Sequence, residues 1–311
     1  MPVLTALALS FALAAPTETG LTVAAEPAPL YGTLLAPEGQ ARAAVLILPG
    51  SGPTDRDGNN PMGVAAATYR RLAEGLAAQG IATVRFDKRG IGQSAAAAPS
   101  EADFTFRDNI SDARLWIDET LARTGFACVW LAGHSEGALV ALATASNDDP
   151  KICGLILLSG AGRKAGVVLR EQLAAAPLPP DLRTAAETAL SELEAGRTTD
   201  APPQLAALFR PSVQPYMISW LALDPAALIG DHDGPVMIGQ GSTDLQTTLT
   251  DAQALKAAQP NARLVLWDGV NHVLKTAPAD RAGNLATYGD PTLPLAPRVV
   301  DDIAGFILQP R

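Results

Sequence analysis

The sequence has few of the residues that nucleic-acid-binding and zinc-binding proteins need. It carries 23 lysine and arginine residues against 32 aspartate and glutamate residues, a net charge of −9, and no basic stripe to neutralise phosphates. Cysteine occurs only twice and histidine only three times, and the cysteines are not clustered with histidines as in a zinc site. We therefore expect no nucleic-acid partner, no bound metal and no other cofactor.

The two cysteines, Cys128 and Cys153, both fall inside expected core strands. Buried free cysteines usually behave as small hydrophobic residues. Export of the protein would permit a disulfide, but a bridge between two strand interiors is geometrically demanding. We therefore expect two free thiols.

The N-terminus carries an apolar run that ends in small residues. Ala12-Leu13-Ala14 fits an Ala-x-Ala cleavage site, although no lysine or arginine precedes the run. The run is too short to span a membrane comfortably, so we expect no stable membrane insertion. We expect residues 1–16 to be a signal peptide and the protein to be periplasmic or secreted. The alternative is an N-terminal segment packed on the domain of a cytoplasmic protein.

Beyond residue 16 the sequence alternates between strand-like and helix-like stretches, and 48% of all residues are hydrophobic. The apolar run at 43–48 is typical of a strand buried on both faces of a parallel sheet. A helix is expected at about 62–79. The alternation predicts a mostly parallel eight-stranded sheet with helices on both faces and right-handed crossovers. The expected strands lie at 19–25, 29–36, 43–48, 81–86, 127–132, 152–158, 235–240 and 262–267.

Residues 163–230 interrupt this alternation, because they contain no convincing strand. They contain helical stretches at about 167–176, 181–195 and 203–209, which are separated by prolines. This pattern indicates a helical insertion. We expect one α/β core made of residues 17–162 and 231–311, with residues 163–230 as a helical cap.

The pentapeptide Gly133-His134-Ser135-Glu136-Gly137 follows a strand-like run and precedes a helix-forming run. Strand, sharp turn and helix are the context in which the Gly-x-Ser-x-Gly motif presents a nucleophile. Side chains at the two glycine positions would collide with the neighbouring strand and helix. We therefore predict that Ser135 is a nucleophile rather than part of a chance glycine-rich turn.

A serine nucleophile needs a base, which is usually a histidine. His134 adjoins Ser135, so its side chain leaves the turn in a different direction, and His232 lies before an expected strand. His272 follows the last expected strand, at the carboxyl edge where α/β sheets form their ligand sites. Elimination of the other two histidines makes His272 the predicted base.

The base needs an acid to hold its tautomer. Asp244 follows the expected strand at 235–240, again at the carboxyl edge, whereas the loop 159–163 contains no acid. Asp268 is the rival, but it lies too close in sequence to His272. Asp244 is therefore the predicted acid, and the order of nucleophile, acid and base is that of the α/β-hydrolase arrangement.

The reaction also needs hydrogen-bond donors for the developing oxyanion. The backbone N–H of Glu136, the residue after the nucleophile, is one expected donor. The second donor should come from the loop after the strand at 43–48, where Ser51 is the first candidate and Gly52 the reserve.

The same loop continues into Asp55-x-Asp57-Gly58-Asn59. This sequence is faintly similar to a calcium-binding loop, but its glycine is misplaced for an EF-hand. We expect a loop that is ordered by its own hydrogen bonds and holds no metal.

Over nearly all of residues 17–311 the chain resembles the α/β-hydrolase superfamily. The supporting motifs are the pentapeptide around Ser135, Phe-Asp-Lys-Arg-Gly-Ile-Gly-Gln-Ser at 86–94, Gly-Ser-Thr-Asp at 241–244 and Asn271-His272. Residues 49–59 together with 134–137 resemble, more narrowly, a bacterial group of serine esterases, acyl hydrolases and serine-aminopeptidase-like proteins. This resemblance implies a helical cap between strands six and seven and hydrolysis of carboxylic esters without a metal. Pro49 stands where His-Gly is frequent in the superfamily, which leaves the second oxyanion donor open.

The predicted function is hydrolysis of small-molecule carboxylic esters through Ser135, His272 and Asp244, with an acyl-enzyme intermediate. A serine peptidase, an aminopeptidase or a thioesterase would use the same triad, because these reactions share one tetrahedral intermediate. A peptidase would also need a group for the substrate amine, such as Glu187 or Glu192. A ligand-binding protein that kept the fold is the non-enzymatic alternative.

Five residues of the expected cap are large and apolar or aromatic. They either form an apolar wall for the substrate or pack in the interior of the cap, and for any single one of them the second interpretation is favoured. They are Phe209, Tyr216, Met217, Trp220 and Leu221.

Overall fold

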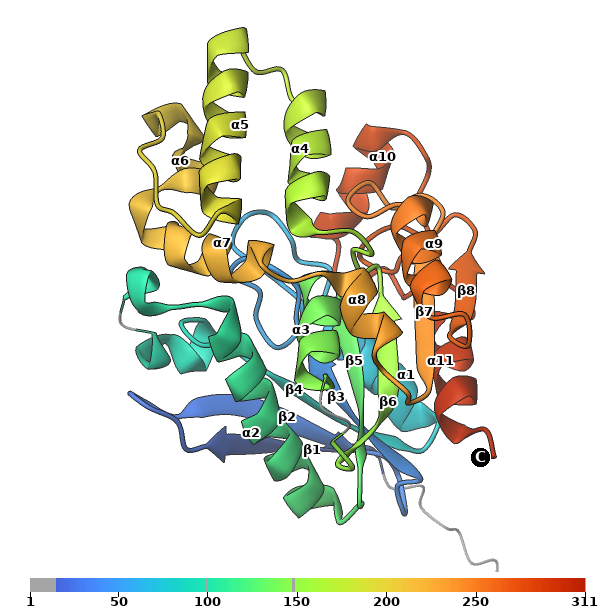
Figure 1. The fold of residues 1–311 in the computed structure, drawn as a ribbon. Coiled ribbons are helices and arrows are strands. Elements are labelled where there is room, and N and C mark those ends of the chain that lie inside the picture. Colours follow the sequence, from blue (N-terminus) through green and yellow to red (C-terminus); the bar gives the residue numbers. More distant parts are fainter. Residues whose placement is uncertain (1–14, 99, 147–148, 311) are drawn as a thin grey trace, which may run out of the picture.

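The computed structural model describes residues 15–98, 100–146 and 149–310. Its eight strands form one sheet in the order β1-β2-β4-β3-β5-β6-β7-β8 (Figure 1). β1 pairs antiparallel with β2, and β2 with β4, while every other neighbouring pair is parallel. The predicted α/β-hydrolase fold is confirmed. The strands are β1 (Thr17–Val23), β2 (Leu30–Ala36), β3 (Ala43–Leu48), β4 (Ile81–Phe86), β5 (Val129–His134), β6 (Ile152–Leu158), β7 (Val236–Gly241) and β8 (Arg263–Trp267).

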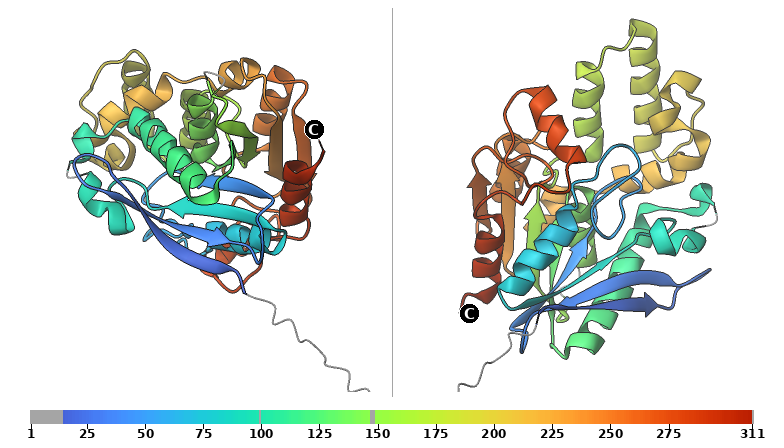
Figure 2. Two further views of the ribbon diagram at one scale, coloured as in Figure 1. Left: turned by 90° about the horizontal axis from the view of Figure 1, so that it is seen from below. Right: turned by 180° about the vertical axis from the view of Figure 1, so that it is seen from behind.

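Helices cover both faces of the sheet. α2 (Phe106–Thr124), α3 (Glu136–Thr144), α8 (Pro225–Gly230) and α9 (Leu249–Ala258) pack on one face, and α1 (Thr68–Ala78) and α11 (Val299–Leu308) pack on the other. α2 lies in front of the sheet in Figure 1, and α1 lies in front of it in the view from behind in Figure 2.

β3 shows why the sheet is covered on both faces. Leu46 and Leu48 belong to one buried cluster, and Val45 and Ile47 belong to the other. Successive side chains of a strand point to opposite faces, so a continuous apolar run fills both layers.

The helix expected at about 62–79 begins only at Thr68. The preceding loop bonds to its start: Ala67 N–H donates to Asn59 Oδ1, and Tyr69 N–H donates to the Asp57 carbonyl. Within the loop, Asp55 Oδ1 accepts the N–H groups of Asp57 and Asn59 at 2.9 Å each. The loop is therefore ordered by its own hydrogen bonds. Among the described residues, no group of three or more His, Cys, Asp or Glu is placed to hold a metal.

Four helices between β6 and β7 rise above the carboxyl edge of the sheet (Figures 1 and 2). They are α4 (Ala165–Ala175), α5 (Pro180–Glu194), α6 (Ala206–Phe209) and α7 (Gln214–Leu221). They share a buried cluster that contains Phe209, Met217 and Leu221.

The sequence-based interpretation missed α7, α8 and the short α10 (Arg281–Ala286). Pro215 and Pro225 stand in the first turn of α7 and α8. A proline is tolerated there because the N–H that it lacks has no intrahelical partner, so these prolines begin helices. Ile229 of α8 belongs to the buried cluster between the sheet and α2, α3 and α9, and not to the cluster that α4–α7 share.

Cys128 and Cys153 form a disulfide, so the expectation of two free thiols is wrong. Cys128 is the residue before β5, and Cys153 is the second residue of β6. The first residues of these two strands, Val129 and Ile152, are paired. Their Cα atoms are 5.1 Å apart, because neighbouring strands run about 4.8 Å apart and the two residues are nearly opposite. The bridge thus joins strand ends rather than strand interiors.

The predicted signal peptide falls almost entirely on residues 1–14, which lie outside the described residues. None of the described helices combines the length and the apolar character that crossing a membrane requires.

Candidate active site

Ser135 occupies the sharp turn between β5 and α3. Its φ is 55° and its ψ is −121°, a backbone conformation that residues other than glycine rarely adopt. The turn is held because Ser135 N–H donates to the Leu158 carbonyl at 2.9 Å. This strained turn presents the serine at the carboxyl edge of the sheet.

The two motif glycines make the turn possible. A Cβ atom on Gly133 would lie 2.2 Å from the Gly137 carbonyl oxygen, and one on Gly137 would lie 2.2 Å from the Leu48 carbonyl oxygen. Backbone atoms cannot yield as flexible side chains do, so only glycine fits at both positions. The turn therefore packs directly on the end of β3, which leads into the loop at Gly50.

His272 and Asp244 form a buried pair beside this turn. His272 Nδ1 lies 2.8 Å from Asp244 Oδ2 and 3.1 Å from Oδ1. Asp244 also accepts hydrogen bonds from the N–H groups of Gln246 and Thr247 and from the Thr247 hydroxyl. Burial acts to raise the pKa of Asp244, but the charge of His272 and these hydrogen bonds lower it to about 2. The ionised carboxylate holds the Nδ1 proton and leaves Nε2 of His272 to exchange a proton with a substrate or a serine.

Ser135, His272, Gly50 and Ser51 line one small cavity of about 100 Å³. Gly52 lines a different, larger cavity, so of the two predicted donors in this loop only Ser51 shares the cavity of Ser135. Within the described residues, no hydrogen bond joins the Ser135 hydroxyl to the His272 ring. Such bonds often tighten only in the substrate complex.

Two side chains hold Gly50, whose carbonyl belongs to the peptide that carries the Ser51 N–H. Gly50 N–H donates to the Tyr69 hydroxyl at 2.8 Å, and Lys88 Nζ donates to the Gly50 carbonyl at 2.6 Å. In a trans peptide the C=O and the following N–H point in opposite directions, so the Ser51 N–H points away from Lys88. Among the described residues, neither the Ser51 nor the Glu136 N–H has a hydrogen-bond acceptor, and both are available to an oxyanion. Their role as its donors stays a prediction.

Three residues that the sequence did not assign take part in this arrangement, namely Tyr69, Lys88 and His134. His134 Nε2 lies 2.7 Å from the His272 carbonyl oxygen, and a carbonyl can only accept, so this nitrogen carries the proton. His134 Nδ1 then accepts from the Tyr69 hydroxyl at 3.0 Å. Burial, above all, lowers the pKa of His134 to about 3, so the ring is neutral at neutral pH.

The result is one chain of hydrogen bonds from Gly50 through Tyr69 and His134 to the backbone of His272. It connects the loop of the expected oxyanion donor to the loop of the expected base. The only sequence signal was the position of His134 next to the serine. Tyr69 lies on α1, and nothing in its local sequence distinguishes it from an ordinary core residue.

Replacing Tyr69 by phenylalanine should lower kcat about tenfold with little change in KM. The variant leaves two buried groups unpaired, Gly50 N–H and His134 Nδ1, and small displacements of catalytic groups are costly. Steady-state kinetics on an ester substrate, with thermal unfolding as a check of folding, measures this. The matched control is Tyr288→Phe, since Tyr288 lines the same cavity but, within the described part of the chain, its hydroxyl bonds only to Gln246 Nε2, at 3.4 Å. Equal losses in both variants would contradict the assignment.

Part of the chain is similar to a known protein family. Residues 60–210 match the model of a family described as serine aminopeptidase, S33. That segment contains Tyr69, Lys88 and Ser135 but neither Asp244 nor His272. No curated protein matches the sequence significantly.

Several solved structures share the fold. Est1E from Butyrivibrio proteoclasticus has a TM-score of 0.58 at 17% identity, over 93% of this chain and 99% of that one. The Pyrococcus furiosus esterase Pf2001 has a TM-score of 0.55 at 17% identity, over 83% and 85% of the two chains. The proline iminopeptidase of Mycobacterium smegmatis has a TM-score of 0.53 at 17% identity, over 82% and 92%. The fold is that of the α/β hydrolases.

These neighbours show the α/β-hydrolase fold, and the family match covers slightly less than half of the chain. Because the neighbours include both an esterase and a peptidase, the shared fold does not determine the substrate class.

Proposed function

We propose that this protein hydrolyses carboxylic esters of small molecules, with Ser135 as nucleophile, His272 as base and Asp244 as the acid that orients His272. The observation that carries the proposal is the buried Asp244–His272 pair beside a cavity that His272 shares with Ser135 and Ser51.

In the first half of the proposed reaction, Ser135 Oγ attacks the ester carbonyl carbon while His272 Nε2 accepts the hydroxyl proton. The negative charge moves to the carbonyl oxygen, which accepts hydrogen bonds from the Ser51 and Glu136 N–H groups. The bond to the alcohol then breaks, the alcohol oxygen takes the proton from His272, and an acyl-serine remains.

In the second half, water gives a proton to His272 and attacks the acyl carbon. The tetrahedral intermediate collapses, Ser135 recovers the proton from His272, and the carboxylic acid leaves. Asp244 stays ionised throughout and stabilises the imidazolium each time it forms.

The charges of α5 favour an ester over a peptide with a free amine. Glu187 is paired with Arg170, and Glu192 with Arg197. Neither glutamate lines the cavity of Ser135 or the larger one beside it. Both glutamates that could bind a substrate amine are therefore already paired with arginines and lie away from the two cavities.

Parallel assays test the proposal. We expect p-nitrophenyl esters to be cleaved faster than aminoacyl p-nitroanilides, and a fluorophosphonate probe to label the peptide that contains Ser135. Faster turnover of the anilides would contradict the ester assignment. Labelling of another residue in active enzyme would remove Ser135 as the nucleophile.

A further inference from the structure

A second cavity, of about 490 Å³, is lined in part by the loop that contains Ser51. Gly52 and Pro53 form part of its wall, whereas Gly50 and Ser51 line the small cavity of Ser135. Residues of one loop therefore line two spaces of unequal size, and the larger space has the volume of a ligand pocket. An ester that extends from Ser135 into both spaces would place its smaller part in the small cavity and its larger part in the second cavity.

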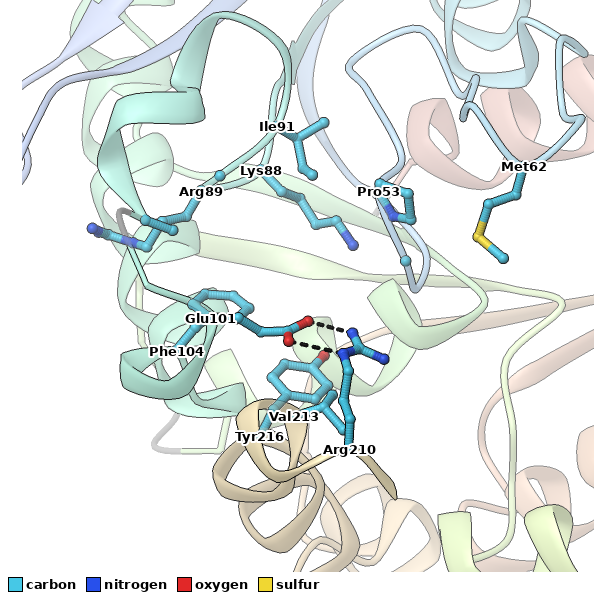
Figure 3. Close-up of a pocket in the computed structure, with 13 residues that line it drawn as sticks. Pro53, Met62, Lys88, Arg89, Ile91, Glu101, Phe104, Arg210, Val213 and Tyr216 are labelled. Atoms are coloured by element: carbon cyan, nitrogen blue, oxygen red, sulfur yellow. Dashed lines mark hydrogen bonds and ion pairs between the residues drawn. The ribbon is translucent and has the colours of Figure 1, made fainter. Parts of the chain in front are cut away.

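Much of the wall of this cavity is apolar. The Phe104 ring stacks on the Tyr216 ring, with centroids 5.4 Å apart and planes inclined by 13°. Figure 3 shows these rings and Val213 on one side of the cavity and Pro53 and Ile91 on the other. A planar or aliphatic group would be desolvated against these side chains.

Charged side chains also line the cavity. Two of them are arginines, and each arginine is paired with a carboxylate. Arg210 makes a two-pronged ion pair with Glu101, with Nε 2.9 Å from Oε2 (Figure 3). Arg89 makes another with Asp112, with Nη2 2.6 Å from Oδ1 and Nε 3.1 Å from Oδ2.

The third cation, Lys88, has no ion pair within 4 Å among the described residues; its Nζ donates to the Gly50 carbonyl at 2.6 Å. Burial lowers the pKa of the Lys88 amine, and the charge of Glu136 acts to raise it. Burial likewise raises the pKa of Glu136, whose carboxylate is opposed by Lys88 and hydrogen-bonded by Tyr216. The two arginines thus each have a carboxylate partner, and the Lys88 amine is hydrogen-bonded to the Gly50 carbonyl.

We propose that the larger cavity binds an uncharged aryl or alkyl group of the ester and discriminates against ammonium and carboxylate groups. An ammonium group entering the cavity would lose water and find Glu101 already paired with Arg210. A carboxylate would find both arginines paired and the Lys88 amine bonded to the Gly50 carbonyl, so either exchange is unfavourable. The inference rests on the proposed ester hydrolysis and adds to it the class of substrate. Peptides with a free α-amine are disfavoured for the same reason as the ammonium ester.

Three aryl acetates of similar size test the inference: 4-ethylphenyl, 4-(aminomethyl)phenyl and 4-(carboxymethyl)phenyl acetate. The acetyl group suits the small cavity, which leaves the aryl group for the larger one. We expect kcat/KM of the neutral ester to exceed that of both charged esters about tenfold or more.

Removing either partner of the Arg210–Glu101 ion pair should weaken the discrimination against one of the two charged esters. Which ester benefits depends on the partner removed. Arg210→Gln leaves Glu101 without its cation and should raise the relative kcat/KM of the ammonium ester about fivefold, as fits a half-exposed pair. Glu101→Gln leaves Arg210 without its carboxylate and should raise the relative kcat/KM of the carboxylate ester by a similar factor. The double variant should restore the wild-type preference, and Arg123→Gln, in an exposed pair on α2, should change nothing.

The outcomes separate this inference from the proposed function. Equal turnover of all three esters, or unchanged preferences in both single variants, overturns the neutral cavity while ester hydrolysis stands. Absence of turnover for every ester, with no fluorophosphonate label on Ser135, overturns both.

Discussion

Replacing Ser135 by alanine is expected to lower kcat for ester hydrolysis about 10⁶-fold, because no hydroxyl remains for His272 to activate. Alanine keeps the Cβ atom of serine and leaves the backbone hydrogen bond to Leu158 in place, so the fold should persist. Steady-state kinetics of the purified variant, compared with the uncatalysed rate, gives the loss, and fluorophosphonate labelling should disappear with it. Retention of more than about one per cent of the activity would show that another residue is the nucleophile.

Two aspartate variants give this experiment a graded control. Asp244→Asn should lower kcat about 10⁴-fold, since a neutral amide no longer holds the proton on His272 Nδ1. Asp268→Asn should leave kcat nearly unchanged, because Asp268 is exposed and bonds to Ser242 rather than to His272. Similar losses in both variants would contradict the choice of Asp244 as the acid.

Replacing Gly137 by alanine is expected to lower the free energy of unfolding by about 3 kcal/mol or more. The added Cβ would lie 2.2 Å from the Leu48 oxygen and 2.8 Å from the Pro49 oxygen, so α3 or the end of β3 has to move. In a chain of this size the change corresponds to roughly 5–10 °C in the melting temperature. Thermal unfolding followed by circular dichroism measures it.

Gly305→Ala is the matched control for this substitution. Gly305 lies on an exposed position of α11, and a Cβ there would meet nothing within 4 Å. Alanine in a helix is favoured over glycine by about 0.5–1 kcal/mol, so this variant should be as stable as the wild type or more so. If Gly137→Ala is equally harmless, the close packing of the turn on β3 is refuted.

The architecture was predictable because it is encoded in short-range patterns. The apolar run of β3 and the alternation of strands and helices do not depend on distant residues. The errors arose where local rules compete. Pro215 is expected to break a helix from its residue type, yet it stands in the first turn of α7. The helix expected from about residue 62 begins six residues later, at Thr68, because the preceding loop is bonded to the start of α1 through Asn59 and Asp57.

The disulfide was missed because it depends on register. Cys128 and Cys153 are brought together by the pairing of β5 with β6. The sequence shows that both residues border strands, but which strands are neighbours and how far each is shifted are settled only when the sheet forms.

The candidate site likewise has features that follow from the local sequence and features that depend on tertiary packing. The sequence by itself determined the strand–turn–helix around Ser135, because the two glycines and their flanking runs act over a few residues. It also put Asp244 and His272 after two strands, while their catalytic roles stay a prediction.

Only the tertiary structure decided how Gly50 is held and how the larger cavity is charged. The Tyr69 hydroxyl meets His134 across 65 positions of the chain, and Arg210 meets Glu101 across 109. Partners so far apart in sequence are chosen by the packing of whole elements, and no local pattern of residue types records that choice.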